Sequence, residues 1–259
     1  MKILSSTIFS LLILAAPFCA QGQQTLLLVG GGQRPQAALK EWVKANAVKD
    51  PKVLIITWAS ANKKQAYETS IQADLREIGV RQFLFSQDIT NSFEKNEFVN
   101  NLSQATHIFF SGGSQTLIMN ILNSDPQLMN QLQHAYWKKN IPVAGTSAGT
   151  AVQAELMITG DTKNLEHGLG FLPKTVIDQH FFKRGREDRL RSFMKQAPGN
   201  FTGIGVDEDG SILFKRDPKT KEFNSTVLGS KNIMVIGPEI NQFRQEKILR
   251  PTLLCSQLF

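Results

Sequence analysis

The sequence has only two cysteines among its 259 residues, Cys19 and Cys255, and this scarcity excludes several kinds of protein. A fold built on disulfides needs several cysteines, and a thiolate zinc site needs closely spaced pairs. Neither pattern is present, and a single cysteine near the C-terminus, Cys255, is typical of a core-filling side chain. We therefore expect apolar burial to hold the fold together, without a structural metal.

Other features are also missing. No internal repeat, low-complexity linker or break in composition divides the chain, which predicts one domain over residues 23–259. The glycines of "VGGGQ", at residues 29–33, lack the G-x-G-x-x-G spacing of a dinucleotide loop, so no such cofactor is expected. The formal charge of +7 is mild, its basic residues cluster only locally, and it predicts no nucleic-acid partner.

The N-terminus has the character of a cleaved export signal. Lys2 precedes the uncharged apolar run "ILSSTIFSLLILAAPF", and Ala20 and Gly22 supply small residues for cleavage. A membrane anchor is the alternative, but the run is slightly short and no flanking charge stops it. The hypothesis of a lipid anchor on Cys19 is weaker still, because the bulky Phe18 stands before it where a small residue is expected. We expect residues 1–22 to be a signal peptide and the protein to be periplasmic or extracellular, without stable membrane insertion.

Apolar runs bounded by glycine alternate with amphipathic segments after the signal. The runs "TLLLV", "KVLII", "RQFLFS", "HIFF" and "IPVAGT" predict buried strands, and residues 35–47, 63–79 and 126–140 have helical spacing. Continuously apolar strands between helices indicate a mostly parallel sheet with helices on both faces. The C-terminal part is β-rich, and we expect some of its strands to pair antiparallel at one side of the sheet.

The segment "GTSAG", residues 145–149, raises the first functional hypothesis. It matches G-x-S-x-G between a strand and a predicted helix, where a sharp turn exposes the serine hydroxyl. Ser147 is then a candidate nucleophile, and the amide of Ala148 a donor to an oxyanion. A packed glycine-rich turn without catalytic function is the alternative.

Two further segments follow predicted strands, whose carboxyl ends gather ligands in parallel sheets. "SGGSQ", at residues 111–115, offers a second oxyanion donor and Gln115 as a substrate contact, although a plain tight turn gives the same pattern. "DQHFFKRGREDRLR" puts His180 at a strand end, with Asp178 predicted on the same face and Gln179 on the other. Arginine forks bind carboxylates, so the four arginines that follow predict a clamp for an acidic substrate. A solvated basic helix is the alternative.

A histidine that activates a serine needs a third group to orient its ring. "GIGVDEDG" supplies Asp207, Glu208 and Asp209 at the end of a predicted strand, and composition does not choose among the three.

Taken together and in this order, "SGGSQ", "GTSAG", "DQHF" followed by "RGR" and "RL", and "GIGVDED" resemble the cyanophycinase branch of the S51 serine peptidases. The resemblance runs from the first strand almost to the C-terminus. It implies a flavodoxin-like α/β fold, akin to class I glutamine amidotransferases, and catalysis without a metal or organic cofactor. The resemblance is compatible with a homodimer but does not determine the oligomeric state.

The resemblance also implies roles for individual residues. Ser147 attacks the scissile carbonyl, His180 transfers the proton and Glu208 orients the imidazole. The amides of Gly113 and Ala148 hold the oxyanion. The positions that match the substrate pocket of the family are Gln115, Asp178, Gln179, Arg184, Arg186 and Arg189, with Asp178 available to a cationic group.

The implied activity is an exopeptidase that releases β-Asp-Arg dipeptides from cyanophycin, a polymer with a poly-aspartate backbone and an arginine on each side-chain carboxyl. Thr150 and Ser114 depart from the usual pattern of the family. The negative charges of Glu187 and Asp188 are also placed to compensate the positive charges of two arginines. An isoaspartyl or α-aspartyl dipeptidase therefore stays an alternative. A non-catalytic exported protein that binds acidic ligands is a third hypothesis.

Overall fold

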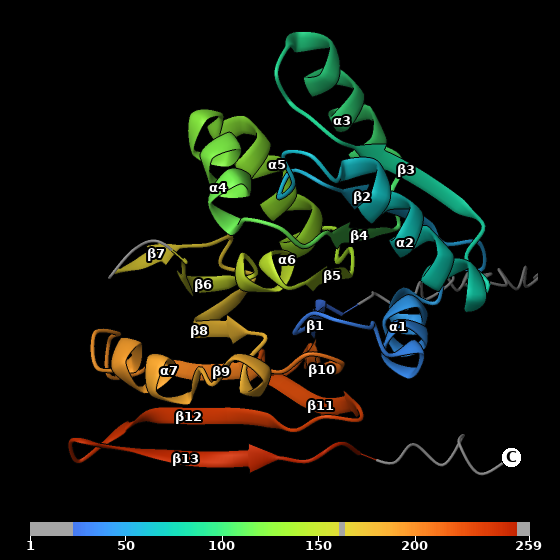
Figure 1. Cartoon of the computed structure of the whole chain (residues 1–259). Coiled ribbons are helices and arrows are strands. Elements are labelled where there is room, and N and C mark those ends of the chain that lie inside the picture. The colour runs from blue at the N-terminus through green and yellow to red at the C-terminus, as the bar shows by residue number, and fades with distance from the viewer. Residues whose placement is uncertain (1–22, 161–163, 253–259) are drawn as a thin grey trace, which may run out of the picture.

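Five adjacent parallel strands make up most of the larger sheet in the computed structural model, which describes residues 23–160 and 164–252 (Figure 1). The predicted signal and Cys255 lie outside these residues. The seven-stranded sheet has the order β11-β10-β1-β5-β4-β2-β3. Its parallel strands are β1 (Thr25–Val29), β5 (Val143–Thr146), β4 (His107–Phe110), β2 (Lys52–Ile56) and β3 (Gln82–Ser86). The five apolar runs thus form the predicted parallel strands.

Helices cover both faces of this sheet, which is why its strands are apolar on both sides. Leu27 and Val29 of β1 join one core cluster with residues of α1 and α2, whereas Leu26 and Leu28 join the other with residues of α3, α4 and α5. The helices are α1 (Gln36–Val43), α2 (Lys64–Glu77), α3 (Ser92–Gln104), α4 (Gln115–Ser124) and α5 (Pro126–Trp137), and the short turn η1 (Lys44–Asn46) extends α1.

The β-rich C-terminal part does more than extend this sheet. Two of its strands, β10 (Gly210–Arg216) and β11 (Phe223–Gly229), form an antiparallel hairpin beside β1, as expected. The others build a second sheet of order β13-β12-β9-β8-β6-β7. Its strands are β6 (Ala154–Ile158), β7 (Leu165–His167), β8 (Leu172–Gln179), β9 (Thr202–Val206), β12 (Ile233–Ile240) and β13 (Phe243–Leu249).

The second sheet has its own core. The amphipathic helix α7 (Glu187–Met194) buries Leu190, Phe193 and Met194 in a cluster with Val176 of β8 and Met234 of β12. Figure 1 shows α7 lying along β9 and beside the long β12–β13 hairpin. The short turn η2 (Phe182–Arg184) precedes α7.

The two sheets meet at the ends of β1 and β8. The amide of His180, just after β8, donates to the carbonyl of Gly30, just after β1 (2.9 Å). Residues 207–209 lead from β9 in the second sheet to β10 in the first. Within the described residues, no helix combines the length and apolar character needed to cross a bilayer.

Candidate active site

Ser147 lies on a sharp turn between β5 and the short helix α6 (Ala148–Ala151). Its φ of 52° and ψ of −113° are rare for a residue with a side chain, and such strain is retained where the surroundings fix it. A Cβ added to Gly145 would lie 2.1 Å from the carbonyl oxygen of Gly149, and one on Gly149 would lie 2.3 Å from that of Phe110. Both glycines of the motif are therefore required by close backbone contacts.

Thr150 explains how this turn is held. Its hydroxyl lies 2.7 Å from the carbonyl oxygen of Val29 and 2.6 Å from that of Gly145, and it accepts the amide of Val29 at 3.0 Å. The hydroxyl thus joins α6 to both β5 and β1. Thr150 thereby stabilises the turn that carries Ser147.

Ser147, His180 and Glu208 form a continuous hydrogen-bonded chain. Nε2 of His180 lies 2.7 Å from Oγ of Ser147, and Nδ1 lies 2.7 Å from Oε1 of Glu208. An ionised carboxylate only accepts, so the proton of the neutral imidazole sits on Nδ1 and Nε2 accepts from the serine hydroxyl. This is the arrangement that lets an imidazole act as a general base toward a serine.

The two acids beside Glu208 are bonded elsewhere. Oδ1 of Asp207 accepts the amide of Lys183 at 2.8 Å, and Oδ1 of Asp209 accepts the amide of Gln33 at 2.6 Å. Each therefore holds a loop that borders the site. Of the three acids that the sequence left open, Glu208 is the one that contacts His180.

The surroundings of His180 favour its neutral form. Burial is the largest cause that lowers its pKa below the ordinary 6.5, and the charges of Arg184 and Arg186 lower it further. The hydrogen bond and charge of Glu208 act in the opposite direction without reversing the shift. The ring is consequently able to accept a proton at neutral pH.

The loop after β4 lies against Ser147, since a Cβ added to Gly112 would be 3.5 Å from that of Ser147. Among the described residues, neither the amide of Gly113 nor that of Ala148 has a hydrogen-bond acceptor. Both are therefore available to an oxyanion beside the serine, although that role stays a prediction. Gln115, the first residue of α4, donates to the carbonyl of Ile158 (2.7 Å).

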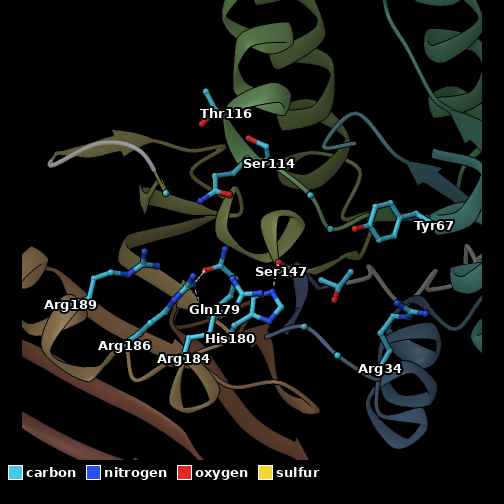
Figure 2. Close-up of a pocket in the computed structure, with 17 residues that line it drawn as sticks. Arg34, Tyr67, Ser114, Thr116, Ser147, Gln179, His180, Arg184, Arg186 and Arg189 are labelled. Atoms are coloured by element: carbon cyan, nitrogen blue, oxygen red, sulfur yellow. Dashed lines mark hydrogen bonds between the residues drawn. The ribbon is translucent and has the colours of Figure 1, made fainter. Parts of the chain in front are cut away.

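A pocket of about 430 Å³ opens over Ser147 and His180 (Figure 2). Arg184, Arg186 and Arg189 stand on one side of it, and Arg34 and Tyr67 on the opposite side. The side chain of Arg184 has no hydrogen-bond or ion-pair partner among the described residues. Of the residues predicted from the sequence, those lining the pocket are Gly113, Gln115, Ser147, Gln179, His180, Arg184, Arg186 and Arg189.

Asp178 is the exception among the residues predicted to bind substrate, and the structure contradicts both its place in the pocket and its availability to a cationic group. It is fully buried and does not line the pocket. Its carboxylate accepts from Nη1 of Arg186 (3.1 Å) and from Nε and Nη2 of Arg189 (2.8 and 2.5 Å). His180 has a φ of 49°, which breaks the strand alternation, so Gln179 and His180 line the pocket together and Asp178 lies elsewhere. It positions two arginines and leaves no open acceptor for a cationic substrate group.

The expected compensation of arginines by Glu187 and Asp188 is present in part, for one arginine that lies outside the pocket. Asp188 pairs with Arg191 at 2.8 Å, and Arg191 also bonds Glu246 of β13. Arg191 does not line the pocket.

Several site residues were not predicted from the sequence. Arg34 bonds Asp74 and donates to Oγ of Ser70 (2.5 Å), and the loop of Gly31 and Gly32 lies under His180. Tyr67 comes from α2. The run of three glycines was a usable signal, but Arg34 and Tyr67 stand in segments with no local motif. Among the described residues, no cluster of histidine, cysteine and acidic side chains suits a metal ion.

Comparison with known proteins gives the family. Residues 26–221 match the model of peptidase family S51. The chain belongs to this family of serine peptidases. It is 36% identical over 174 residues to a cyanophycinase from Synechococcus elongatus, which covers 63% of this chain and 52% of that protein. It is 28% identical over 242 residues to a cyanophycinase from a Nostoc species, covering 84% and 75%. The chain thus spans about half the length of the first of these relatives.

Solved structures establish the fold class. A peptidase from an acI-B1 actinobacterium superposes with a TM-score of 0.63 at 20% identity, covering 90% of this chain and 99% of that one. A putative peptidase E from Listeria monocytogenes gives 0.61 at 14% identity, covering 80% and 100%. The S51 chain therefore has a peptidase E-like fold of the class I glutamine amidotransferase type, as the family resemblance implied.

Proposed function

We propose that this S51 chain is an exported serine exopeptidase that hydrolyses β-aspartyl-arginine units of cyanophycin and releases β-Asp-Arg. The observation that carries the proposal is the chain of two 2.7 Å hydrogen bonds from Ser147 through His180 to Glu208, at the floor of an arginine-lined pocket. The relatives called cyanophycinase support the choice of substrate.

The proposed reaction follows from the geometry. Nε2 of His180 removes the hydroxyl proton as Oγ of Ser147 attacks the scissile carbonyl carbon. The negative charge that develops on the carbonyl oxygen is held by the amides of Gly113 and Ala148. His180 then protonates the leaving amine, and the acyl-enzyme is hydrolysed by water with His180 again as the base. Glu208 keeps the ring oriented and stabilises the imidazolium.

The arginine side of the pocket suits the free α-carboxylate of a β-linked aspartyl residue. Arg186 and Arg189 already share the charge of Asp178, so their net attraction for an anion is reduced. Arg184 has no such partner among the described residues and is the strongest candidate for a paired contact with that carboxylate.

Export is proposed from the sequence of residues 1–22 alone. An exported enzyme of this type would act on polymer released by other cells. The mass of the mature protein tests this point, because cleavage after Gly22 predicts a chain beginning at Gln23.

Incubation of the purified protein with cyanophycin tests the activity. We expect β-Asp-Arg as the product, and a loss of at least about 10⁴-fold in rate in Ser147→Ala. Ser124→Ala, an exposed change at the end of α4, is the matched control and should keep full activity. Cleavage of small isoaspartyl or α-aspartyl dipeptides without attack on the polymer would reject the substrate. Unchanged function in Ser147→Ala would favour the non-catalytic binding protein.

A further inference from the structure

A second cavity lies at the end of β3, between α2 and α3, and has a volume of about 510 Å³. It shares the carboxyl edge of the larger sheet with the catalytic pocket. Helix α2 borders both, since Tyr67 lines the catalytic pocket and Glu68 lines the second cavity. We call it the β3 cavity, and its lining residues are Gln65, Glu68, Gln72, Phe85, Ser86, Gln87, Asp88, Glu94, Glu97 and Phe98.

Glu68 is the unusual residue of the β3 cavity. Glu68 is buried, with only 4% of its surface exposed to solvent. Oε2 accepts from Nε2 of Gln87 at 2.8 Å, but Oε1 has no hydrogen-bond partner among the described residues. Burial raises the pKa of this carboxyl above its ordinary range. A buried carboxylate oxygen without a partner is costly, and a cation in the cavity would remove that cost.

The other acids of the β3 cavity leave its charge negative. Asp88 is paired with Lys64. Glu94 holds the start of α3, where its Oε2 accepts from the amide and hydroxyl of Thr90 (2.6 and 2.8 Å). The carboxylate of Glu97 has no hydrogen-bond or ion-pair partner among the described residues. Four acidic side chains therefore line the cavity, and none of its lining residues is cationic. Lys64, which pairs with Asp88, is not one of them.

The arrangement favours an extended organic cation over a metal ion. The acids of the β3 cavity do not converge into a metal-binding cluster in the part of the chain that the structure describes. They are spread around a space that also has the rings of Phe85 and Phe98 and the amides of three glutamines. A planar guanidinium has donors on several sides and stacks on aromatic rings, so it matches such a lining.

We propose that the β3 cavity binds a guanidinium group, with Glu68 and Glu97 as its carboxylate partners. Under the proposed function, the source is an arginine side chain of the polymer, held away from the bond being cleaved. The cavity would then retain long substrates near the catalytic pocket. This link to the substrate rests on the proposed function, whereas the cation site itself does not.

Titration with 1-ethylguanidinium, followed by calorimetry or NMR, tests the site. This probe has no carboxylate, so the arginine-lined catalytic pocket gives it no partner. We expect saturable binding that weakens about tenfold or more in Glu68→Gln. Glu97→Gln, an exposed change on α3, should also weaken binding and carries no risk to the fold. Glu41→Gln, which removes the same charge from α1, should leave binding unchanged.

Equal binding in all three variants, or no binding by the unmodified protein, would overturn the proposal. So would binding of Ca²⁺ at this cavity in preference to the probe. A separate arm uses Ser147→Ala with soluble cyanophycin fragments, which should displace 1-ethylguanidinium. Failure of displacement alone rejects the polymer as the source. Failure of hydrolysis in the unmodified protein rejects the proposed function and leaves the probe titration unaffected.

Discussion

At the scale of single residues, the three adjacent acids of "VDED" differ in what their carboxylates contact. Glu208 bonds the ring of His180, whereas Asp207 and Asp209 accept backbone amides of neighbouring loops. Sequence reasoning identified the group of three but did not choose one from spacing, because the choice depends on loops that lie far away in the chain. The resemblance pointed to Glu208, and its contact with His180 agrees with that role.

Glu208→Gln tests this assignment. The amide keeps the size of the side chain but removes the charge that stabilises an imidazolium and permits the wrong ring tautomer, so we expect kcat to fall by about 10³–10⁴-fold. Asp209→Asn is the matched control, because the asparagine oxygen still accepts the amide of Gln33. A similar loss in both variants would contradict a specific role for Glu208.

The pH dependence of activity tests the surroundings of His180. Its pKa is lowered mainly by burial, so the neutral base persists below pH 6.5, and kcat/KM should fall only as the pH drops through that lowered value. The charge of Arg184 contributes to the lowering, so Arg184→Gln should raise the pKa and move the acid limb to higher pH. The ring signal of His180 in an NMR titration should move in the same direction.

Arg191→Gln provides the control for this measurement, because it removes the same charge from a residue bonded to Asp188 and Glu246 outside the pocket. In Arg191→Gln, the fall of kcat/KM at acid pH should occur at the same pH as in the unmodified protein. An equal shift in both variants would show that net charge, rather than the position of Arg184, determines the pKa.

At the scale of elements, the five parallel strands were predictable from their apolar runs because helices cover both faces of the sheet. Helices α3 and α4 were not predicted. Helix α3 buries only Phe98 and Leu102, so its periodicity is faint. The second sheet was also missed, because strand patterns do not tell which partner a strand will choose. The bend that separates Asp178 from the pocket arises at His180, and no pattern in the sequence predicts the positive φ of that residue.

The loop between β1 and α1 supports His180 at this scale. Gly31 has a φ of 126°, and a Cβ there would lie 2.2 Å from Cε1 of His180. Gly31→Ala should therefore displace the ring and reduce kcat/KM by at least about 10²-fold, as a displacement near 1 Å does in other active sites. Steady-state kinetics and a melting curve measure the two consequences separately.

Gly79→Ala is the matched control for that change. Gly79 has a φ of 101°, but an added Cβ would meet nothing within 4 Å. Both variants should lose about 1 kcal/mol or more of stability from backbone strain. Only Gly31→Ala should lose activity, and equal activity in the two would show that the contact with His180 does not matter.

At the scale of the whole molecule, the candidate active site belongs to neither sheet alone. Ser147 follows a strand of the first sheet, His180 follows a strand of the second, and Glu208 lies in the connection between them. The hydrogen bond from the amide of His180 to the carbonyl of Gly30 fixes the sheets at this point. The chemistry of the serine therefore depends on the docking of the two sheets.

The measurement that tests this account most directly is the mass of the intact protein after treatment with a serine-directed acylating probe. We predict a single adduct on Ser147, greatly slowed in His180→Ala and absent after denaturation, since activation requires the folded contact between the two side chains. Absence of an adduct from the folded protein, or an adduct that forms equally fast in His180→Ala, would contradict a nucleophilic serine activated by His180.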